Sequence, residues 1–337
     1  MWTQFDYPCF ARSVSTSSSQ GSGGAVEFSE FKQAVQDNVG RVVIGKADVV
    51  EMMLVAMLCE GHLLLEDVPG IGKTTLAKTL ARSVGCSFAR IQFTPDLLPG
   101  DVTGINFYNQ KTQGFEFRPG PIFSQIVLAD EINRATPRTQ SSLLEAMQER
   151  QTTVDRETYA LERPFLVIAT QNPIELEGTF PLPEAQLDRF LMQLELGYPS
   201  LAEEEEMLLR YERQDPLVDL QPVADAADIV DLQGRVRTIH VNEDVRNYAL
   251  AVVRATREHP SVALGVSPRG TLALYRAGQA YAALHGRDFV IPSDIQRLAP
   301  PILTHRIHIS PQTRLRGRTP QQVVAEVVES VPAPVAE

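Results

Sequence analysis

The chain has 337 residues, which is enough for two domains and a sizeable core, and its hydrophobic content of 43% is typical of a soluble globular protein. The formal net charge of −11 argues against a protein whose whole surface grips nucleic acid, although it does not exclude a local basic patch. We expect a cytoplasmic protein without disulfides. The three cysteines are scattered along the chain, and no apolar run approaches the roughly 20 residues of a membrane span. We also see no secretory signal.

The first 26 residues form a predicted disordered tail. They include a run of serine and glycine at 13–24, which cannot bury enough apolar surface to offset the entropy of ordering. An amphipathic helix is predicted next over residues 27–39, and a second helix over residues 48–59. The short apolar turn between them contains Val43, Ile44 and Gly45.

A glycine-rich turn at residues 66–75 follows a predicted buried strand at 62–65 and runs into a predicted helix. This order of strand, turn, Lys-Thr and helix is typical of a phosphate-binding loop, in which backbone amides at the glycines and the helix N-terminus surround phosphate. In that reading Lys73 would reach the β- and γ-phosphates and Thr74 would ligate Mg²⁺. Asp67 departs from the motif G-x-x-x-x-G-K-[ST], which has glycine there. The alternative is an ordinary turn with an exposed lysine.

Further apolar runs, separated by helical segments, predict a parallel sheet covered on both faces. Ligand sites in such sheets lie at the carboxyl ends of the strands. Alternation around polar tips predicts two β-hairpin inserts, one within residues 94–121 and one within 151–164. With the strand at 62–65, the predicted strands cover residues 88–93, 126–129, 165–170 and 190–196.

Polar residues at two strand ends would complete a nucleotide site. Asp130 can hold Mg²⁺ and Glu131 can orient or deprotonate the attacking water, while Asn172 ends the next strand and could contact the γ-phosphate or its water. Arg189 could be an ordinary surface cation with Asp188 as its neighbour. Arg269 is placed in a first helical turn by a capping Ser267, where the helix dipole repels its charge; this suggests a bound anion, with a solvated arginine as the alternative.

The character of the chain changes near residue 200. Ser200 followed by Glu203 predicts a capping box, and the acidic run 203–206 complements the helix dipole there. We expect a smaller helical domain over 200–331, after a core at 27–199, and a short tail at 332–337. Its main predicted helices lie near residues 242–258, 267–285, 292–298 and 320–331.

Taken together, these motifs resemble the AAA+ ATPases, and more closely the MoxR family, over about residues 27–331. The resemblance implies an AAA+ fold of the α/β class: a parallel five-stranded sheet with flanking helices and hairpin inserts, followed by a helical lid. The segments that carry it are residues 61–74, 117–121, 128–135, 169–173, 183–190 and 267–269.

The resemblance also implies roles for individual residues. Lys73 and Thr74 look like the Walker A pair, and Asp130 and Glu131 like Walker B. Asn172 is similar to sensor 1 and Arg269 to sensor 2, and we expect Asp130, Glu131, Asn172 and Arg269 to lie together behind the glycine-rich turn. Arg189 looks like the arginine finger that acts on a neighbouring subunit's nucleotide. The implied cofactors are ATP and Mg²⁺, and the implied nucleotide-binding residues are Val43, Ile44, Gly45, Pro69, Gly70, Ile71, Gly72, Lys73, Thr74 and Thr75.

The function implied by this family is ATP hydrolysis that remodels or matures a client protein, in the manner of a chaperone. MoxR-like proteins are associated with metalloenzyme maturation and with partners that carry a von Willebrand factor A domain. A finger supplied in trans implies a homo-oligomer, for which we expect a hexamer with both hairpins facing the pore. Three alternatives stay open: a metal-chelatase subunit, a nucleotide-binding scaffold without turnover, and a nucleic-acid motor. The motor is disfavoured because the hairpin tips carry only Lys111 and Arg156.

Overall fold

The computed structural model describes residues 26–172, 178–212 and 216–334. The predicted N-terminal tail therefore lies outside the described residues except for Val26, as does the end of the C-terminal tail. Among the helices described, none is both long and apolar enough to cross a lipid bilayer.

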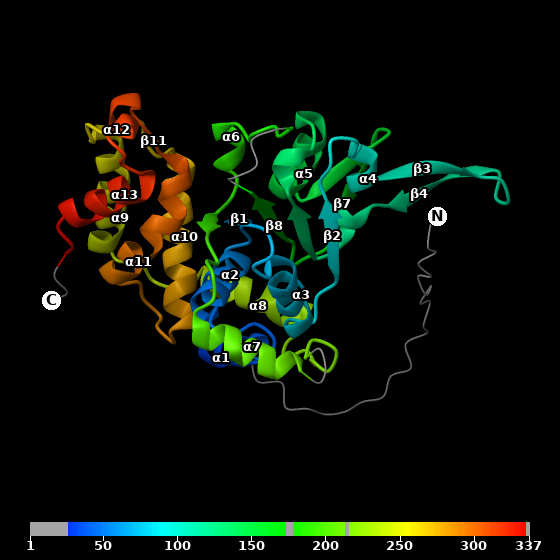
Figure 1. Ribbon diagram of the computed structural model, residues 1–337, viewed down its shortest axis with the longest axis horizontal. Coiled ribbons are helices and arrows are strands. Elements are labelled where there is room, and N and C mark those ends of the chain that lie inside the picture. Colours follow the sequence, from blue (N-terminus) through cyan, green and yellow to red (C-terminus); the bar gives the residue numbers. More distant parts are fainter. Residues whose placement is uncertain (1–25, 173–177, 213–215, 335–337) are drawn as a thin grey trace.

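A five-stranded parallel sheet forms the centre of the fold, in the order β2-β5-β8-β1-β9 (Figure 1). All five predicted strands are confirmed, and the strand that ends before Asn172 lies beside the strand that ends in Asp130, as expected. The strands are β1 (Leu63–Glu66), β2 (Phe88–Gln92), β5 (Ile126–Asp130), β8 (Leu166–Gln171) and β9 (Met192–Leu194).

The two faces of the sheet enter two separate hydrophobic cores, because successive side chains of a strand point to opposite sides. Leu63 and Leu65 enter one core, while Leu64 between them enters the other. This burial of both faces explains the continuous apolar runs in the sequence. The first core is built with α1 (Phe28–Gly40), α2 (Ala47–Leu58) and α3 (Lys73–Ser83), and the second with α5 (Pro137–Glu149).

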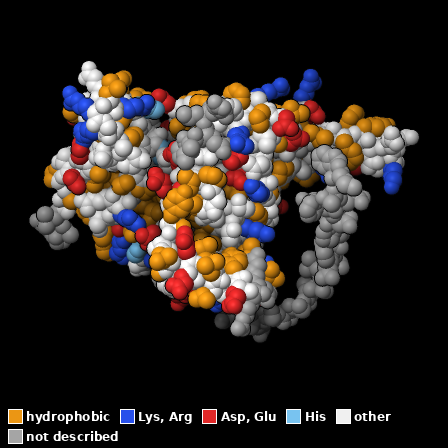
Figure 2. All heavy atoms as spheres, in the orientation of Figure 1, with side chains coloured by type: hydrophobic (Ala, Val, Ile, Leu, Met, Phe, Trp, Pro, Cys, Tyr) orange, Lys and Arg blue, Asp and Glu red, His pale blue; other side chains and the backbone are white. Residues whose placement is uncertain are grey.

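Both predicted hairpins are present. A stacked pair joins them, since the rings of Phe117 and Tyr159 have centroids 4.0 Å apart. The first hairpin follows α4 (Pro99–Thr103) and projects from the body (Figure 1). Hydrophobic side chains are exposed along it (Figure 2), and Phe115 is 75% exposed. The strands are β3 (Gly104–Asn109) and β4 (Gly114–Pro119), then β6 (Gln151–Val154) and β7 (Glu157–Ala160).

The C-terminal part is mostly helical, as predicted, although α12 and the short strands β10 and β11 were not predicted. Two further differences concern longer helices. α8 was not predicted, and α11 continues through Pro300 and Pro301 to Leu303 instead of ending at Leu298. Burial of Ile302 and Leu303 in the main core outweighs the hydrogen bonds that the prolines cannot donate. The helices are α7 (Leu201–Tyr211), α8 (Ala226–Val236), α9 (Glu243–Glu258), α10 (Pro268–Leu284), α11 (Pro292–Leu303), α12 (Pro311–Leu315) and α13 (Pro320–Ser330), with the short strands β10 (Val262–Leu264) and β11 (His308–Ile309).

The helices after residue 200 pack in different ways. α8 buries Ile229, Leu232 and Val236 in the core that it shares with α2, whereas α7 buries no residue. The capping box of α7 is confirmed: Ser200 Oγ accepts from Glu203 N, and Glu203 Oε2 accepts from Ser200 N at 2.6 Å. α10, α11 and α13 also contribute to this core, so lid and sheet are packed together. The domain division at residue 200 stays a prediction.

Candidate functional site

The turn between β1 and α3 has the backbone that a phosphate loop needs. Gly70 and Gly72 have φ of +86° and +90°, which disfavours any residue with a Cβ atom. A Cβ atom at either position would meet nothing within 4 Å, so the constraint is conformational and not one of space. Gly72 is the N-cap of α3, so the free amides of the first helical turn open directly onto the turn.

Lys73 folds back over this turn. Its Nζ donates a hydrogen bond to the carbonyl oxygen of Asp67 at 2.5 Å. Burial lowers the pKa of Lys73, while the carboxylates of Asp67, Asp130 and Glu131 act in the opposite direction. The ammonium of Lys73 is held by one neutral carbonyl and lies near several carboxylates at the loop. It is therefore well placed to replace its hydrogen bond to that carbonyl with one to a phosphate oxygen.

Asp67, which departs from the phosphate-loop motif, connects the turn to the end of β9. Its Oδ2 accepts from the backbone N–H groups of Leu196 and Gly197, at 2.6 and 2.9 Å. Asp67 is not among the residues with positive φ, so glycine is not required at this position. The departure from the motif therefore replaces a flexible residue with a carboxylate that anchors the loop.

Asp130 and Glu131 lie at the carboxyl end of β5 and are both held by neighbouring strands. Asp130 Oδ2 accepts from Arg90 Nη2 at 2.6 Å, and Asp130 Oδ1 accepts from Thr170 Oγ1 at 2.6 Å. Glu131 Oε2 accepts from Gln92 Nε2 at 2.8 Å, and Glu131 adopts a left-handed backbone with φ of 57°. Backbone strain in a non-glycine residue is maintained only where the surroundings impose it, as they often do at functional sites.

Most of the predicted residues of the glycine-rich turn, together with those of the strand ends, line one pocket of about 370 Å³. It brings Lys73 and Thr74 together with Asp130, Glu131 and Asn172. The hydroxyl of Thr74 and the carboxylate of Asp130 are oxygen donors of the kind that Mg²⁺ prefers, so this pocket fits a magnesium-bound phosphate chain. Sequence reasoning missed Arg90 and Gln92, which belong to a strand predicted only as part of the sheet.

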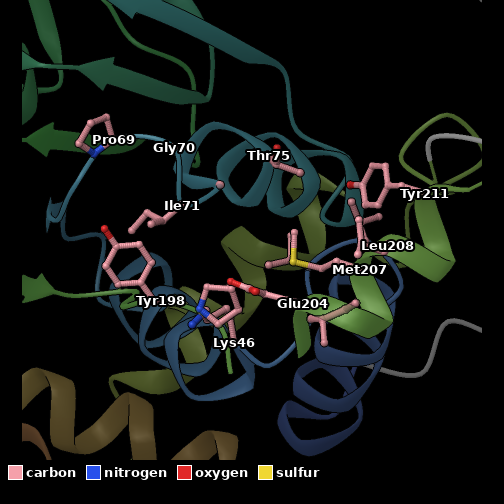
Figure 3. Close-up of a pocket in the computed structure, with 15 residues that line it drawn as sticks. Lys46, Pro69, Gly70, Ile71, Thr75, Tyr198, Glu204, Met207, Leu208 and Tyr211 are labelled. Carbon is pink, nitrogen blue, oxygen red and sulfur yellow. The ribbon is translucent and has the colours of Figure 1, made fainter. Parts of the chain in front are cut away.

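A second, larger pocket of about 670 Å³ adjoins the same turn. Val43 and Ile44 line it together with Pro69, Ile71 and Thr75, and their contact with a nucleotide stays a prediction. Its opposite wall was not predicted, because it comes from an exposed helix distant in sequence. Figure 3 shows that wall, formed by Tyr198 and by Glu204, Met207, Leu208 and Tyr211 of α7.

Gly45 has a different place from the one expected. It is not among the lining residues of this pocket but backs onto α7, where a Cβ atom would collide with Oε1 of Glu203. Its φ of +71° also favours glycine. Gly45 therefore allows the turn that carries Val43 and Ile44 to lie close against α7.

Arg269 does not lie behind the glycine-rich turn, so that expectation is wrong. It lines a separate pocket of about 330 Å³ together with Arg189, Gly61 and His62. Gly61 and His62 precede β1, whereas the glycine-rich turn follows it, and five residue steps from Gly61 to the end of β1 span about 16 Å. Sequence reasoning failed because it had no measure of where the first turn of α10 meets the sheet.

Ser267 also behaves differently from the prediction. It occupies the N-cap of α10, but its side chain makes no capping bond. Its Oγ instead donates to Asp188 Oδ2 at 3.0 Å. Arg269 Nη1 lies 4.0 Å from the same oxygen, so the start of α10 is tied to the segment that carries Arg189.

A glycine-rich turn enters a helix, and carboxylates lie opposite it at the end of another parallel strand of the same sheet. This combination defines a phosphate-loop nucleoside triphosphatase. Family comparison agrees with this class. Residues 62–192 match the model of the ATPase family associated with various cellular activities, and residues 254–327 match that of the AAA lid domain.

Several relatives match over most of their length. YeaC of Bacillus subtilis, whose function is uncharacterised, is 53% identical over 89% of this chain and 93% of its own. Chaperone MoxR1 of Mycobacterium tuberculosis is 40% identical over 93% of this chain and 84% of its own. A crystal structure of a candidate ATPase from Cytophaga hutchinsonii superimposes with a TM-score of 0.86 at 38% identity, covering 91% of this chain and 96% of that one. The chain therefore belongs to the MoxR family of AAA+ ATPases.

Proposed function

We propose that this protein is a Mg²⁺-dependent ATPase whose complete site forms between neighbouring copies of the chain in a ring, for which we expect a hexamer. The observation that carries this proposal is the separation of the two halves of the site. Lys73, Asp130 and Glu131 lie at the carboxyl end of the sheet, whereas Arg189 and Arg269 lie beside the start of β1. This separation supports the proposal that the two arginines complete a neighbour's site and not their own.

Within one copy, the chain's own groups bind and orient the nucleotide. The amides at Gly70 and Gly72 and the ammonium of Lys73 hold the phosphates. Thr74 and Asp130 would hold Mg²⁺, which when bound neutralises charge on the β- and γ-phosphates. Glu131 would orient the attacking water and accept its proton, with Asn172 near the γ-phosphate, and Gln92 keeps the carboxylate of Glu131 in place.

The nucleoside would occupy the larger pocket beside the turn. Apolar side chains on both walls, including Ile44 and Met207, suit the flat faces of a purine base. The volume of about 670 Å³ lies within the usual range for a small-molecule site. We infer that α7 closes over the base, and that Pro69, Ile71 and Thr75 lie between base and phosphates.

Arg189 and Arg269 would stabilise the charge that develops on a neighbour's γ-phosphate. Arginine fingers contribute about 10³–10⁵ in rate in related phosphoryl-transfer systems. The side chain of Arg189 has no ion-pair partner within residues 26–172, 178–212 and 216–334, so its charge is available to a ligand.

We infer that the hydrolysis cycle remodels or matures a client protein in the cytoplasm, with metalloenzymes as one client class and a von Willebrand factor A protein as a partner. A relative at 40% identity is named a chaperone, which supports this role. The exposed apolar side chains of the β3–β4 hairpin, including Ile105 and Phe115, could contact a client in the ring pore.

Two experiments test this function. Arg189→Ala should leave assembly intact and reduce ATP turnover by about 10³-fold or more; wild-type turnover by the assembled variant would contradict the trans assignment. Glu131→Gln should bind ATP without hydrolysing it and should retain a client and its partner in a pull-down. The matched control is Lys73→Ala, which should not bind ATP, and equal recovery by both variants would contradict ATP-dependent client binding.

A further inference from the structure

One buried side chain, Arg306, joins the lid to the segment that carries Arg189. Arg306 ends the 3-10 turn Thr304–Arg306 after α11, and its side chain is 2% exposed. Its Nε donates to Asp188 Oδ1 at 2.8 Å, and its Nη2 donates to the carbonyl oxygens of Asp188 and Phe190 at 3.3 and 2.5 Å. Its Nη1 donates to the carbonyl oxygen of Leu191 at 3.0 Å and to that of Ile302.

These bonds enclose Arg189 on both sides in the sequence. Asp188 precedes it, and Phe190 and Leu191 follow it, and all three accept from the one guanidinium. On the other side of the segment, Leu191 N donates to the carbonyl oxygen of His62 at 2.8 Å, which attaches it to the start of β1. The backbone of Arg189 is therefore clamped between the sheet and the lid.

Asp188 connects the same clamp to Arg269. Its Oδ1 binds Arg306, while its Oδ2 accepts from Ser267 Oγ and lies 4.0 Å from Arg269 Nη1. One carboxylate thus contacts two places in the lid, the turn after α11 and the start of α10. Burial lowers the pKa of Arg306 to about 10 and Asp188 opposes that change, so the guanidinium remains charged at neutral pH.

We propose that Arg306 and Asp188 are positioning residues that lock Arg189 and Arg269 into one rigid unit, so that the lid delivers both arginines together to a neighbour's nucleotide. This inference rests on the proposed function, in which both arginines act in trans. It adds that a movement of the lid moves Arg189 as well, since the lid grips the backbone on both sides of it. A displacement of about 1 Å at a reacting centre can cost about 10² in rate.

The first test changes the two positioning residues. Arg306→Met removes the clamp, Arg306→Lys keeps the charge but loses the fork, and Asp188→Asn keeps the shape but loses the charge. We expect each to lower kcat by about 10²-fold with little change in KM for ATP. Arg297→Met is the matched control, because Arg297 is an exposed arginine of α11 that pairs with Asp48 at the surface, and it should retain wild-type turnover. Wild-type kcat in both Arg306 variants would overturn the proposal.

The second test separates positioning from a loss of fold. Subunits with Arg306→Met keep an intact phosphate loop, and subunits with Lys73→Ala keep an intact lid and Arg189. In a one-to-one mixture, about one interface in four combines the two intact halves, so turnover should return to about a quarter of the wild-type value. A mixture that remains as inactive as its parts would show that Arg306 acts within its own subunit, and would overturn the proposal.

The two proposals fail in different ways. A mixture of Arg189→Ala and Lys73→Ala subunits tests only the action in trans. If that mixture regains turnover and the Arg306→Met mixture does not, the positioning role alone is wrong. If neither mixture regains turnover, the trans arrangement itself is wrong. Asp188→Asn removes the charge but leaves the carbonyl bonds of Arg306 intact. When mixed with Lys73→Ala subunits it should recover about a quarter of the wild-type turnover, as Arg306→Met should.

Discussion

Asp67 Oδ2 accepts a hydrogen bond from the backbone N–H of Leu196 at 2.6 Å. This bond connects the start of the phosphate loop to the end of β9, where the chain turns toward α7 and the larger pocket of about 670 Å³. The two walls of that pocket are therefore joined by one carboxylate. A glycine at the same position, as in the usual motif, could not make this connection.

Restoring the motif should weaken the protein. Asp67→Gly and Asp67→Ala both leave the amides of Leu196 and Gly197 without their acceptor. We expect each variant to lose about 1–3 kcal/mol in the free energy of unfolding, measured by urea denaturation. Asp96→Ala, at an exposed position, should change it by less than about 0.5 kcal/mol. A more stable Asp67→Gly variant would contradict the anchoring role.

Gln92 should affect catalysis and not nucleotide binding. Its amide holds Oε2 of Glu131 at 2.8 Å, and Gln92→Ala leaves that oxygen with the longer contact to Arg134 Nη1 at 3.4 Å, which positions it less firmly. We expect kcat to fall by about 10- to 100-fold with KM for ATP nearly unchanged, measured in steady-state assays. Gln33→Ala, which removes an exposed bond to Asp37 on α1, is the control. A raised KM at unchanged kcat would assign Gln92 to nucleotide binding instead.

Acid should destabilise the fold through His62. Its Nε2 donates to the carbonyl oxygen of Met147 at 2.9 Å, and its Nδ1 accepts from Val167 N at 3.0 Å, so protonation of Nδ1 would break a buried bond. Burial lowers the pKa of His62 from 6.5 to about 4. The unfolded chain therefore binds a proton between these values that the folded chain does not, and stability falls as pH falls from 6.5 to 4.

The expected loss from this one group is about 3 kcal/mol across that pH range. His62→Gln can keep one donor and one acceptor but cannot titrate. Its free energy of unfolding should therefore fall less than that of the wild type between pH 7.5 and pH 5, as measured by urea denaturation. An identical pH dependence in His62→Gln and wild type would rule out this origin.

A side chain at position 45 should weaken the binding of ATP. Gly45→Ala places a Cβ atom against Glu203 at a φ of +71°, which costs about 1–2 kcal/mol even without the collision. We expect the variant to bind ATP about tenfold more weakly by calorimetry, since Val43 and Ile44 share the turn. The double variant Gly45→Ala with Glu203→Ala removes the collision but keeps the backbone strain, so it should recover part of the affinity. Full affinity in the single variant would contradict the close approach of α7.

The sequence predicted the strands and the site residues that depend on a local pattern of apolar and polar residues. Apolar runs identified all five strands because both faces of a parallel sheet are buried, and polar residues at strand ends identified Asp130 and Asn172. It did not predict contacts between distant segments. The wall formed by Met207 and Tyr211 lies on a helix without a buried face, and the position of Arg269 depends on how α10 docks.

Arg306 illustrates the same limit. In the sequence it is one arginine between two histidines, with no motif to distinguish it. Its importance comes from carbonyl oxygens at 188, 190 and 191, which face it only after the lid has packed against the sheet.

The central claim is that Arg189 and Arg269 act together on a neighbour's nucleotide, and it is tested most directly by mixing two inactive variants. Subunits with Arg269→Ala keep the phosphate loop, and subunits with Lys73→Ala keep the arginines. If the account is correct, each variant alone has little turnover, and a one-to-one mixture recovers about a quarter of the wild-type ATPase rate. If Arg269 instead served the nucleotide of its own subunit, the mixture would recover no turnover, because no subunit would then combine Lys73 with Arg269.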